Sequence, residues 1–158
     1  PWVSNDECGG MSNAAFERFC LPELVQLSKR FGGLGMHCCA DAPHQFPLFK
    51  KIPNFYAFNR VPSIQLRGGW KEDKALAILG GADGPTWVPG WCTPETVAWF
   101  LGHAPAGTRF IFHSNGFETV DEGKRWLDEC RGLIEGRGQS SAAGKAAAPG
   151  HAACACCG

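Results

Sequence analysis

The sequence predicts an α/β fold in which parallel strands are joined by crossover helices. Apolar, strand-like segments alternate with amphipathic helical segments over residues 1–135, and this alternation is typical of parallel sheets. In addition, each predicted strand ends in polar residues, and parallel α/β folds build their ligand sites at the carboxyl ends of the strands. We therefore expect one domain over residues 1–135, with its functional site at that edge of the sheet.

The composition excludes two classes of partner. The 158-residue chain has Lys+Arg 15 and Asp+Glu 15, so no basic excess indicates nucleic acid or an anionic membrane. No apolar run approaches the roughly 20 residues of a membrane-spanning helix, and no segment resembles a signal peptide. The nine cysteines mix core-like positions with a terminal cluster, which favours free thiols over a disulfide framework. We expect a cytoplasmic protein that binds a small-molecule substrate or another protein.

The first half of the chain predicts a helix, a strand, a short helix and a second strand. Ser12 can cap a helix whose apolar side chains recur at spacings of three and four, and Gly32-Gly33 ends it. Pro22 lies inside this pattern and predicts a kink or the start of a second helical half. Residues 34–39 then indicate a buried strand, 43–51 a short helix and 55–59 another strand.

The second half predicts two more strands and two more helices. The apolar run 74–79, which Gly80-Gly81 ends, is interpreted as the third strand, and Thr93-Pro94 is a capped helix start. Residues 109–113 predict the fourth strand, and the capping box 119–122 opens a last helix. Residues 136–158 are rich in alanine, glycine, serine and cysteine without an apolar period, which predicts a flexible tail.

The end of the first predicted strand carries a metal-ligating pair. Residues i and i+2 of a strand point to the same side, so His37 and Cys39 can direct an imidazole and a thiolate at one point. Together they supply two of the three protein ligands of an open, catalytic zinc site. The alternative is a buried histidine that bonds to backbone beside an inert cysteine.

Four segments carry a resemblance to a known family. They are the serine-led helix start with its internal proline (11–22), the His-Cys-Cys-Ala strand end (37–40), the glycine-aspartate turn with the threonine-proline helix start (80–83 and 93–97), and the last strand with its glycine turn (110–116). In this order they resemble the C-terminal half of the uroporphyrinogen decarboxylase superfamily, which includes the zinc-dependent corrinoid methyltransferases. The resemblance implies the C-terminal half of a TIM (β/α)8 barrel. Because such barrels need about 250 residues, the missing N-terminal half of the barrel is an expected partner.

The resemblance also implies metal ligands, with two departures. His37 and Cys39 match the family's zinc-binding strand end, but Ala40 stands where the family has glycine. In the methyltransferase branch the third zinc ligand is a cysteine, and this chain has Asn115 there. Because an amide is a poor zinc ligand, either His113 completes the metal site or zinc binding is weak or absent.

Other site residues follow from the same comparison. Asp83 resembles a position that faces the pocket, and Asp6 lies in a loop where the family contacts substrate. Both are expected catalytic residues, and their alternatives are a turn residue and a solvated acidic loop. The strand that should hold this loop is expected before Pro1. The amides Asn59 and Asn115 are expected to contact the cofactor.

Three functions are compatible with these residues. The leading one is a methyltransferase that uses a zinc-activated thiolate together with a corrinoid protein. The second is a uroporphyrinogen decarboxylase, which removes carboxylate groups from a tetrapyrrole without a cofactor. The third is a non-catalytic barrel that binds a corrinoid or tetrapyrrole. The pair His37 and Cys39 favours the first function, and Asn115 favours the third.

Overall fold

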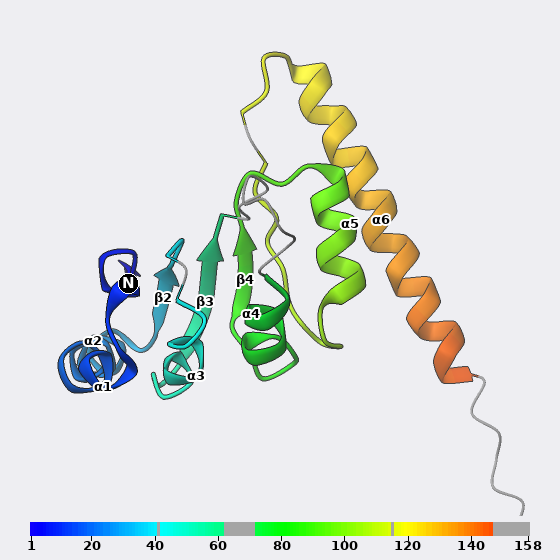
Figure 1. The fold of residues 1–158 in the computed structure, drawn as a ribbon. Helices are drawn as coiled ribbons and strands as arrows, with labels where there is room; N and C mark the ends of the chain where they lie inside the picture. Colours follow the sequence, from blue (N-terminus) through cyan, green and yellow to red (C-terminus); the bar gives the residue numbers. More distant parts are fainter. Residues whose placement is uncertain (41, 62–71, 115, 147–158) are drawn as a thin grey trace, which may run out of the picture.

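The sheet has four strands, and all of them run in parallel (Figure 1). The computed structural model describes residues 1–40, 42–61, 72–114 and 116–146. The strands lie side by side in chain order: β1 (Trp2–Ser4), β2 (Leu34–His37), β3 (Phe55–Arg60) and β4 (Thr86–Pro89). Helices alternate with these strands, so the predicted parallel α/β class is confirmed.

The helical segments differ widely in length. They are η1 (Glu7–Gly10), α1 (Asn13–Ala15), the π-helical η2 (Phe16–Cys20), α2 (Leu21–Phe31), α3 (Phe46–Phe49), α4 (Glu72–Leu79), α5 (Pro94–His103) and α6 (Val120–Ala146). None of the helices in the described ranges is long and apolar enough to cross a membrane.

The segment from Ser12 to Phe31 confirms the predicted capped and interrupted helix. The Ser12 hydroxyl accepts a hydrogen bond from the backbone N–H of Ala15 (3.2 Å). The π-helical turn η2 ends two residues before Pro22, which lies in the first turn of α2. Proline has no N–H to donate and crowds the preceding turn, so a wider turn at this point relieves the conflict. Gly32, with φ of 76°, ends the helix in the left-handed conformation.

Two strand assignments from the sequence are wrong. Residues 74–79 are not a strand, because they belong to helix α4. Their alanine and leucine residues favour a helix, and the run lacks the alternation of a half-buried strand. The strand in this region is β4, only four residues long. Likewise, the strand expected before Pro1 is β1 itself, whose three residues are too few to show a period.

The predicted strand at 109–113 extends the sheet beyond β4. Trp87 and Phe110 form an isolated parallel bridge. The N–H of Trp87 donates to Arg109 O (2.8 Å), and the N–H of Ile111 donates back to Trp87 O (2.8 Å). This segment therefore follows β4 in the same direction as the other strands.

Both helix caps of the second half are confirmed, but the tail boundary is not. The hydroxyl of Thr93 accepts from the N–H of Thr96 (3.3 Å), and that of Thr119 accepts from the N–H of Glu122 (3.2 Å). Helix α6 then continues through Gly136 to Ala146, where a flexible tail was predicted. Alanine has the highest helix propensity, so a segment without an apolar period can still be helical. Residues 147–158 lie outside the described residues.

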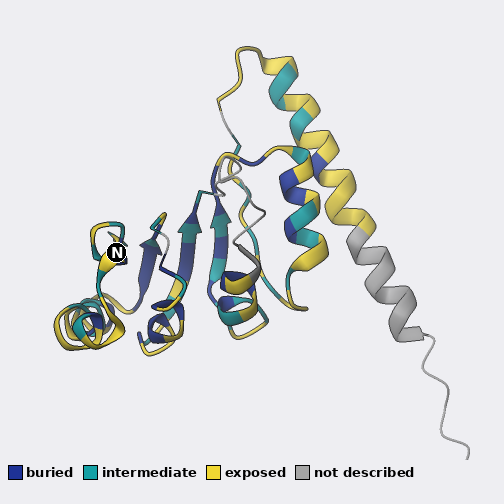
Figure 2. Ribbon diagram, viewed as in Figure 1, coloured by how far each residue is buried: buried dark blue, intermediate teal, exposed yellow. Residues whose placement is uncertain are grey.

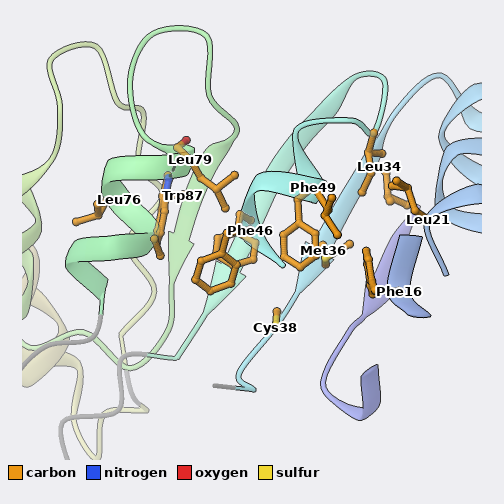
Figure 3. Close-up of a cluster of buried hydrophobic side chains, with 14 of the residues drawn as sticks. Phe16, Leu21, Leu34, Met36, Cys38, Phe46, Phe49, Leu76, Leu79 and Trp87 are labelled. Carbon is orange, nitrogen blue, oxygen red and sulfur yellow. Dashed lines mark hydrogen bonds between the residues drawn. The ribbon is translucent and has the colours of Figure 1, made fainter. Parts of the chain in front are cut away.

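An aromatic cluster holds the helices against one face of the sheet. Phe49 lies at its centre, with ring centroids 5.8 Å from Phe16 and 6.1 Å from Phe58. Phe58 in turn contacts Trp87 edge-on at 5.2 Å. Figure 3 shows Phe16, Phe49 and Trp87 between the helices and the strands, and Figure 2 shows burial concentrated along the strands. The cluster also draws on α2, α4 and α5 through Leu21, Leu76 and Phe100.

Truncating the centre of this cluster is expected to weaken the fold. Phe49→Ala removes a fully buried ring and should lower the free energy of unfolding by about 3–5 kcal/mol. Phe31→Ala is the matched control, because Phe31 is 59% exposed and its loss should cost less than about 1 kcal/mol. Denaturant unfolding of both variants measures the difference. Equal losses would contradict the central role of Phe49.

Candidate metal centre

The register of the sheet brings one row of residues to its carboxyl edge. Ser4 pairs with His37, His37 with Asn59, and Asn59 with Val88. Because side chains alternate across a strand, the residues of such a row share one face of the sheet. The opposite face carries Met36 and Phe58 into the aromatic core. The row therefore places His37 and Asn59 side by side on the face away from the helices.

Three potential metal ligands converge at this edge. One ligand atom each from Asp6, His37 and Cys39 lies within 4.8 Å of the others. His37 Nε2 is 3.1 Å from Asp6 Oδ2, and the Cys39 Sγ is 4.0 Å from His37 Nδ1. Two atoms bound to a tetrahedral zinc ion at about 2.0–2.1 Å lie about 3.3 Å apart. The imidazole and the carboxylate thus already have the separation of two ligands on one ion.

Asn59 fixes the orientation of the His37 ring. The Asn59 Nδ2 group donates to the carbonyl of Val88 (2.5 Å), which turns the amide oxygen towards His37 Nδ1 in a short hydrogen bond. With Nδ1 occupied by the Asn59 oxygen, Nε2 is the ring nitrogen that faces Asp6, at 3.1 Å, and the one open to a metal ion.

Asp6 is held in its ionised form. Partial burial is the largest influence and opposes ionisation, but the N–H of Cys39, the His37 ring and the Ser4 hydroxyl together lower the pKa of Asp6 below its ordinary value. The N–H of Cys39 donates to Asp6 Oδ1 at 2.5 Å. The same carboxylate thus joins the end of β1 to the turn that follows β2, and its other oxygen faces His37.

A buried polar network supports the loop that carries Asp6. The N–H of Asn5 donates to His37 O (2.8 Å), and its side-chain amide donates to Gln45 Oε1 (2.9 Å). Both Asn5 and Gln45 are buried. Arg60, also buried, donates to the carbonyls of Cys38 (3.1 Å) and Ala40 (3.0 Å). The buried side chains of Asn5, Gln45 and Arg60 therefore hold the loop after β1 and the turn after β2 in place.

The departure at Ala40 has a structural counterpart in Gly9. A Cβ placed on Gly9 would lie 2.2 Å from the Cβ of Ala40, whereas its next neighbours would be at 3.6 and 3.7 Å. The missing side chain of Gly9 therefore makes room for the methyl group of Ala40. This contact sets how closely η1, directly after Asp6, approaches the turn that holds Cys39.

A pocket of about 370 Å³ lies next to residues that contact two of the three candidate ligands. Asn59, which bonds to His37, is also one of its lining residues. Most of the other walls are apolar or aromatic: Trp2, Val61, Val88, Gly90, Trp91 and His113. The N–H of Val61 also donates to the Cys39 Sγ (3.4 Å). The pocket and the ligand cluster are therefore connected through β3.

The structure places the predicted site residues in three groups. Asp6, His37, Cys39 and Asn59 lie together, so Asp6 joins His37 and Cys39 as a potential metal ligand. His113 lines the pocket and does not belong to the described cluster of ligand atoms. Asn115 lies outside the described residues. The sequence predicted that Asp6 is catalytic. Its position two residues after the short strand β1, which brings it next to His37, was not recognised.

Asp83 is separated from this site. It lies exposed between α4 and β4, in a second pocket of about 510 Å³ that Asn54 and Phe55 also line. Phe55 begins β3, so this pocket lies at the amino edge of the sheet. The sequence placed Asp83 with the other site residues because of the family resemblance and because residues 74–79 were assigned as a strand. Residues 74–79 are helical, and Asp83 lies at the other edge of the sheet.

Comparison with protein-family models, with curated proteins and with solved structures finds no match to this chain. The function is therefore inferred from the geometry of the site and from the four motifs described above.

The contact between Gly9 and Ala40 predicts a compensating pair of substitutions. Gly9→Ala should lower the free energy of unfolding by about 1–3 kcal/mol, because two methyl groups would overlap. Adding Ala40→Gly should restore most of this loss, since the remaining neighbours are at ordinary contact distances. A double-mutant cycle by denaturant unfolding measures the coupling. If the two changes in the free energy of unfolding simply add, the contact does not limit how closely the two backbone segments approach.

Asn59 is expected to act through His37. Asn59→Ala removes the hydrogen bond to Nδ1 and should weaken zinc binding by about 10–100-fold. Asn59→Asp keeps an acceptor for Nδ1–H and should retain more of the affinity, and Asn13→Ala, at an exposed helix start, should retain all of it. Competition with a coloured zinc chelator measures each affinity. Parent-like binding by Asn59→Ala would refute the orienting role.

Proposed function

We propose that this chain forms the C-terminal half of a (β/α)8 barrel that transfers a methyl group to a zinc-bound thiol, with a corrinoid protein as the methyl carrier. The observation that carries this proposal is the convergence of Asp6, His37 and Cys39 at the carboxyl edge of a parallel sheet. The motifs that resemble the uroporphyrinogen decarboxylase superfamily support the same assignment.

The strand order favours a barrel rather than an open, doubly wound sheet. The strand order is β1-β2-β3-β4, and the segment 109–113 continues it in the same direction. Doubly wound sheets instead reverse their strand order at a switch point. The helices from α2 to α5 pack into one core on one face of the sheet, as helices do on the outside of a barrel.

The donor set fits an open zinc site. Catalytic zinc sites use three protein ligands chosen from imidazole, thiolate and carboxylate groups, and leave one position for substrate. Zinc bound there would lower the pKa of a substrate thiol, so that the thiol is ionised at neutral pH. His37, Cys39 and Asp6 would hold the ion, and Asn59 would keep the imidazole in the tautomer that ligates through Nε2.

The pocket beside the ligands suits the methyl group and its carrier. Trp2, Val61 and Val88 offer apolar walls against which a methyl group could pack. In the transfer a corrinoid carrier would supply the methyl group and keep the electron pair of the bond that breaks, and the sulfur of the substrate thiol would form the new bond to carbon. The proton of that thiol would pass to solvent, to which the site is open at the exposed Cys39.

Metal analysis tests the ligand set. The purified chain is expected to hold about one zinc ion, as an open three-ligand site does. Asp6→Asn, His37→Ala and Cys39→Ala should each reduce the bound zinc, and His113→Ala should leave it unchanged, because His113 lies outside the cluster. Loss of zinc in His113→Ala, with zinc retained in Asp6→Asn, would instead support the ligand set predicted from the sequence.

An activity assay separates the candidate functions. With methylcobalamin and an alkyl thiol, the zinc-loaded chain should form the thioether, and Cys39→Ala should not. Release of carbon dioxide from uroporphyrinogen without metal would overturn the proposal in favour of decarboxylation. Binding of a corrinoid or tetrapyrrole without either reaction would overturn it in favour of a binding barrel.

A further inference from the structure

Three sulfur atoms lie close together where the loop that follows β1 contacts the end of η2. They belong to Cys8 in η1, Met11 just after it, and Cys20 at the end of η2. The Sγ of Cys20 is 3.7 Å from the Sγ of Cys8 and 3.6 Å from the Sδ of Met11. We propose that these two thiols and one thioether form a binding site for a cuprous ion, Cu(I). The proposal does not depend on the proposed function of the zinc ligands.

The distances already suit a shared ion. Two sulfurs held at about 2.3 Å from one metal lie about 3.7–4.0 Å apart in tetrahedral or trigonal geometry. The two contacts made by Cys20 differ from this range by at most a few tenths of an ångström. All three residues are half-buried, so an ion can reach the sulfurs from solvent while the surrounding protein excludes most of the water.

The backbone on both sides of the site is held in place. The buried amide of Gln45 donates to the carbonyls of Cys8 (2.8 Å) and Met11 (3.1 Å) through one nitrogen. Its oxygen in turn accepts from Asn5. Cys20 is held by the π-helical turn, in which the N–H of Leu21 bonds to Phe16 O. The sulfurs therefore meet on fixed elements, which is what a metal site requires of its supporting residues.

The ligand types select the metal. Thiolate and thioether sulfurs are soft ligands that favour Cu(I), whereas zinc sites are built from thiolate, imidazole and carboxylate groups. A cluster of one methionine and two cysteines therefore favours Cu(I). The cluster of Asp6, His37 and Cys39 has the opposite character, with one nitrogen and one oxygen ligand for a single sulfur.

The experiment removes the thiol of the candidate zinc site and the three thiols near the C-terminus, and it leaves the buried Cys38, Cys92 and Cys130 in place. The full chain carries Cys39→Ser, Cys154→Ser, Cys156→Ser and Cys157→Ser as a common background. Cu(I) is added anaerobically in competition with a coloured cuprous chelator. We expect one Cu(I) per chain, with an X-ray absorption spectrum that shows three sulfur neighbours and no nitrogen.

Substitutions within the cluster give the decisive comparison. In this background Cys20→Ser should lower the Cu(I) affinity at least about a hundredfold, and Met11→Leu about tenfold without disturbing the fold. Met36→Leu and Cys130→Ser are matched controls in the core and should leave the affinity unchanged. Circular dichroism checks that each variant is folded. Parent-like affinity in Cys20→Ser and Met11→Leu, or nitrogen among the copper neighbours, would overturn the proposal.

Discussion

The register of the parallel strands is the constraint on which the rest of the site depends. It places Ser4, His37, Asn59 and Val88 in one row, and the parallel direction brings the residues after each strand to the same edge. A slip of one residue between β2 and β3 would turn every side chain of one strand to the other face. His37 would then lose Asn59, and Phe58 would leave the aromatic core. Packing of the core therefore also fixes the polar site.

The sequence predicts best where a local signal is strong. The hydroxyl caps at Ser12, Thr93 and Thr119 form as expected, because capping involves atoms only three residues apart. Short strands are harder to recognise, since β1 and β4 show no full period and are fixed by their neighbours in the sheet. The run 74–79 shows the converse, because an apolar segment between glycines fits either a buried strand or a helix.

The site was predictable in part for the same reason. The spacing of His37 and Cys39 is local, and the two side chains do lie near one another. The partnership of His37 with Asp6 and Asn59 depends on three strands in register, which no spacing within one segment reveals. Asp83 shows the effect of one wrong strand assignment. With residues 74–79 taken as a strand, Asp83 was expected at the carboxyl edge of the sheet, whereas it lies at the amino edge. The sulfur cluster spans a loop and a π-helical turn and has no sequence motif of its own.

The close approach of Gly9 and Ala40 also limits the routes by which this chain can change. The space between the two backbones accommodates one methyl group, and either position could hold it. A lineage that moves the methyl group from position 40 to position 9 must first pass through glycine at both, because the reverse order crowds the turn beside Cys39. The two residues are far apart along the chain, yet their mutational history is coupled. The tolerance of one position to substitution is therefore set by the residue present at the other.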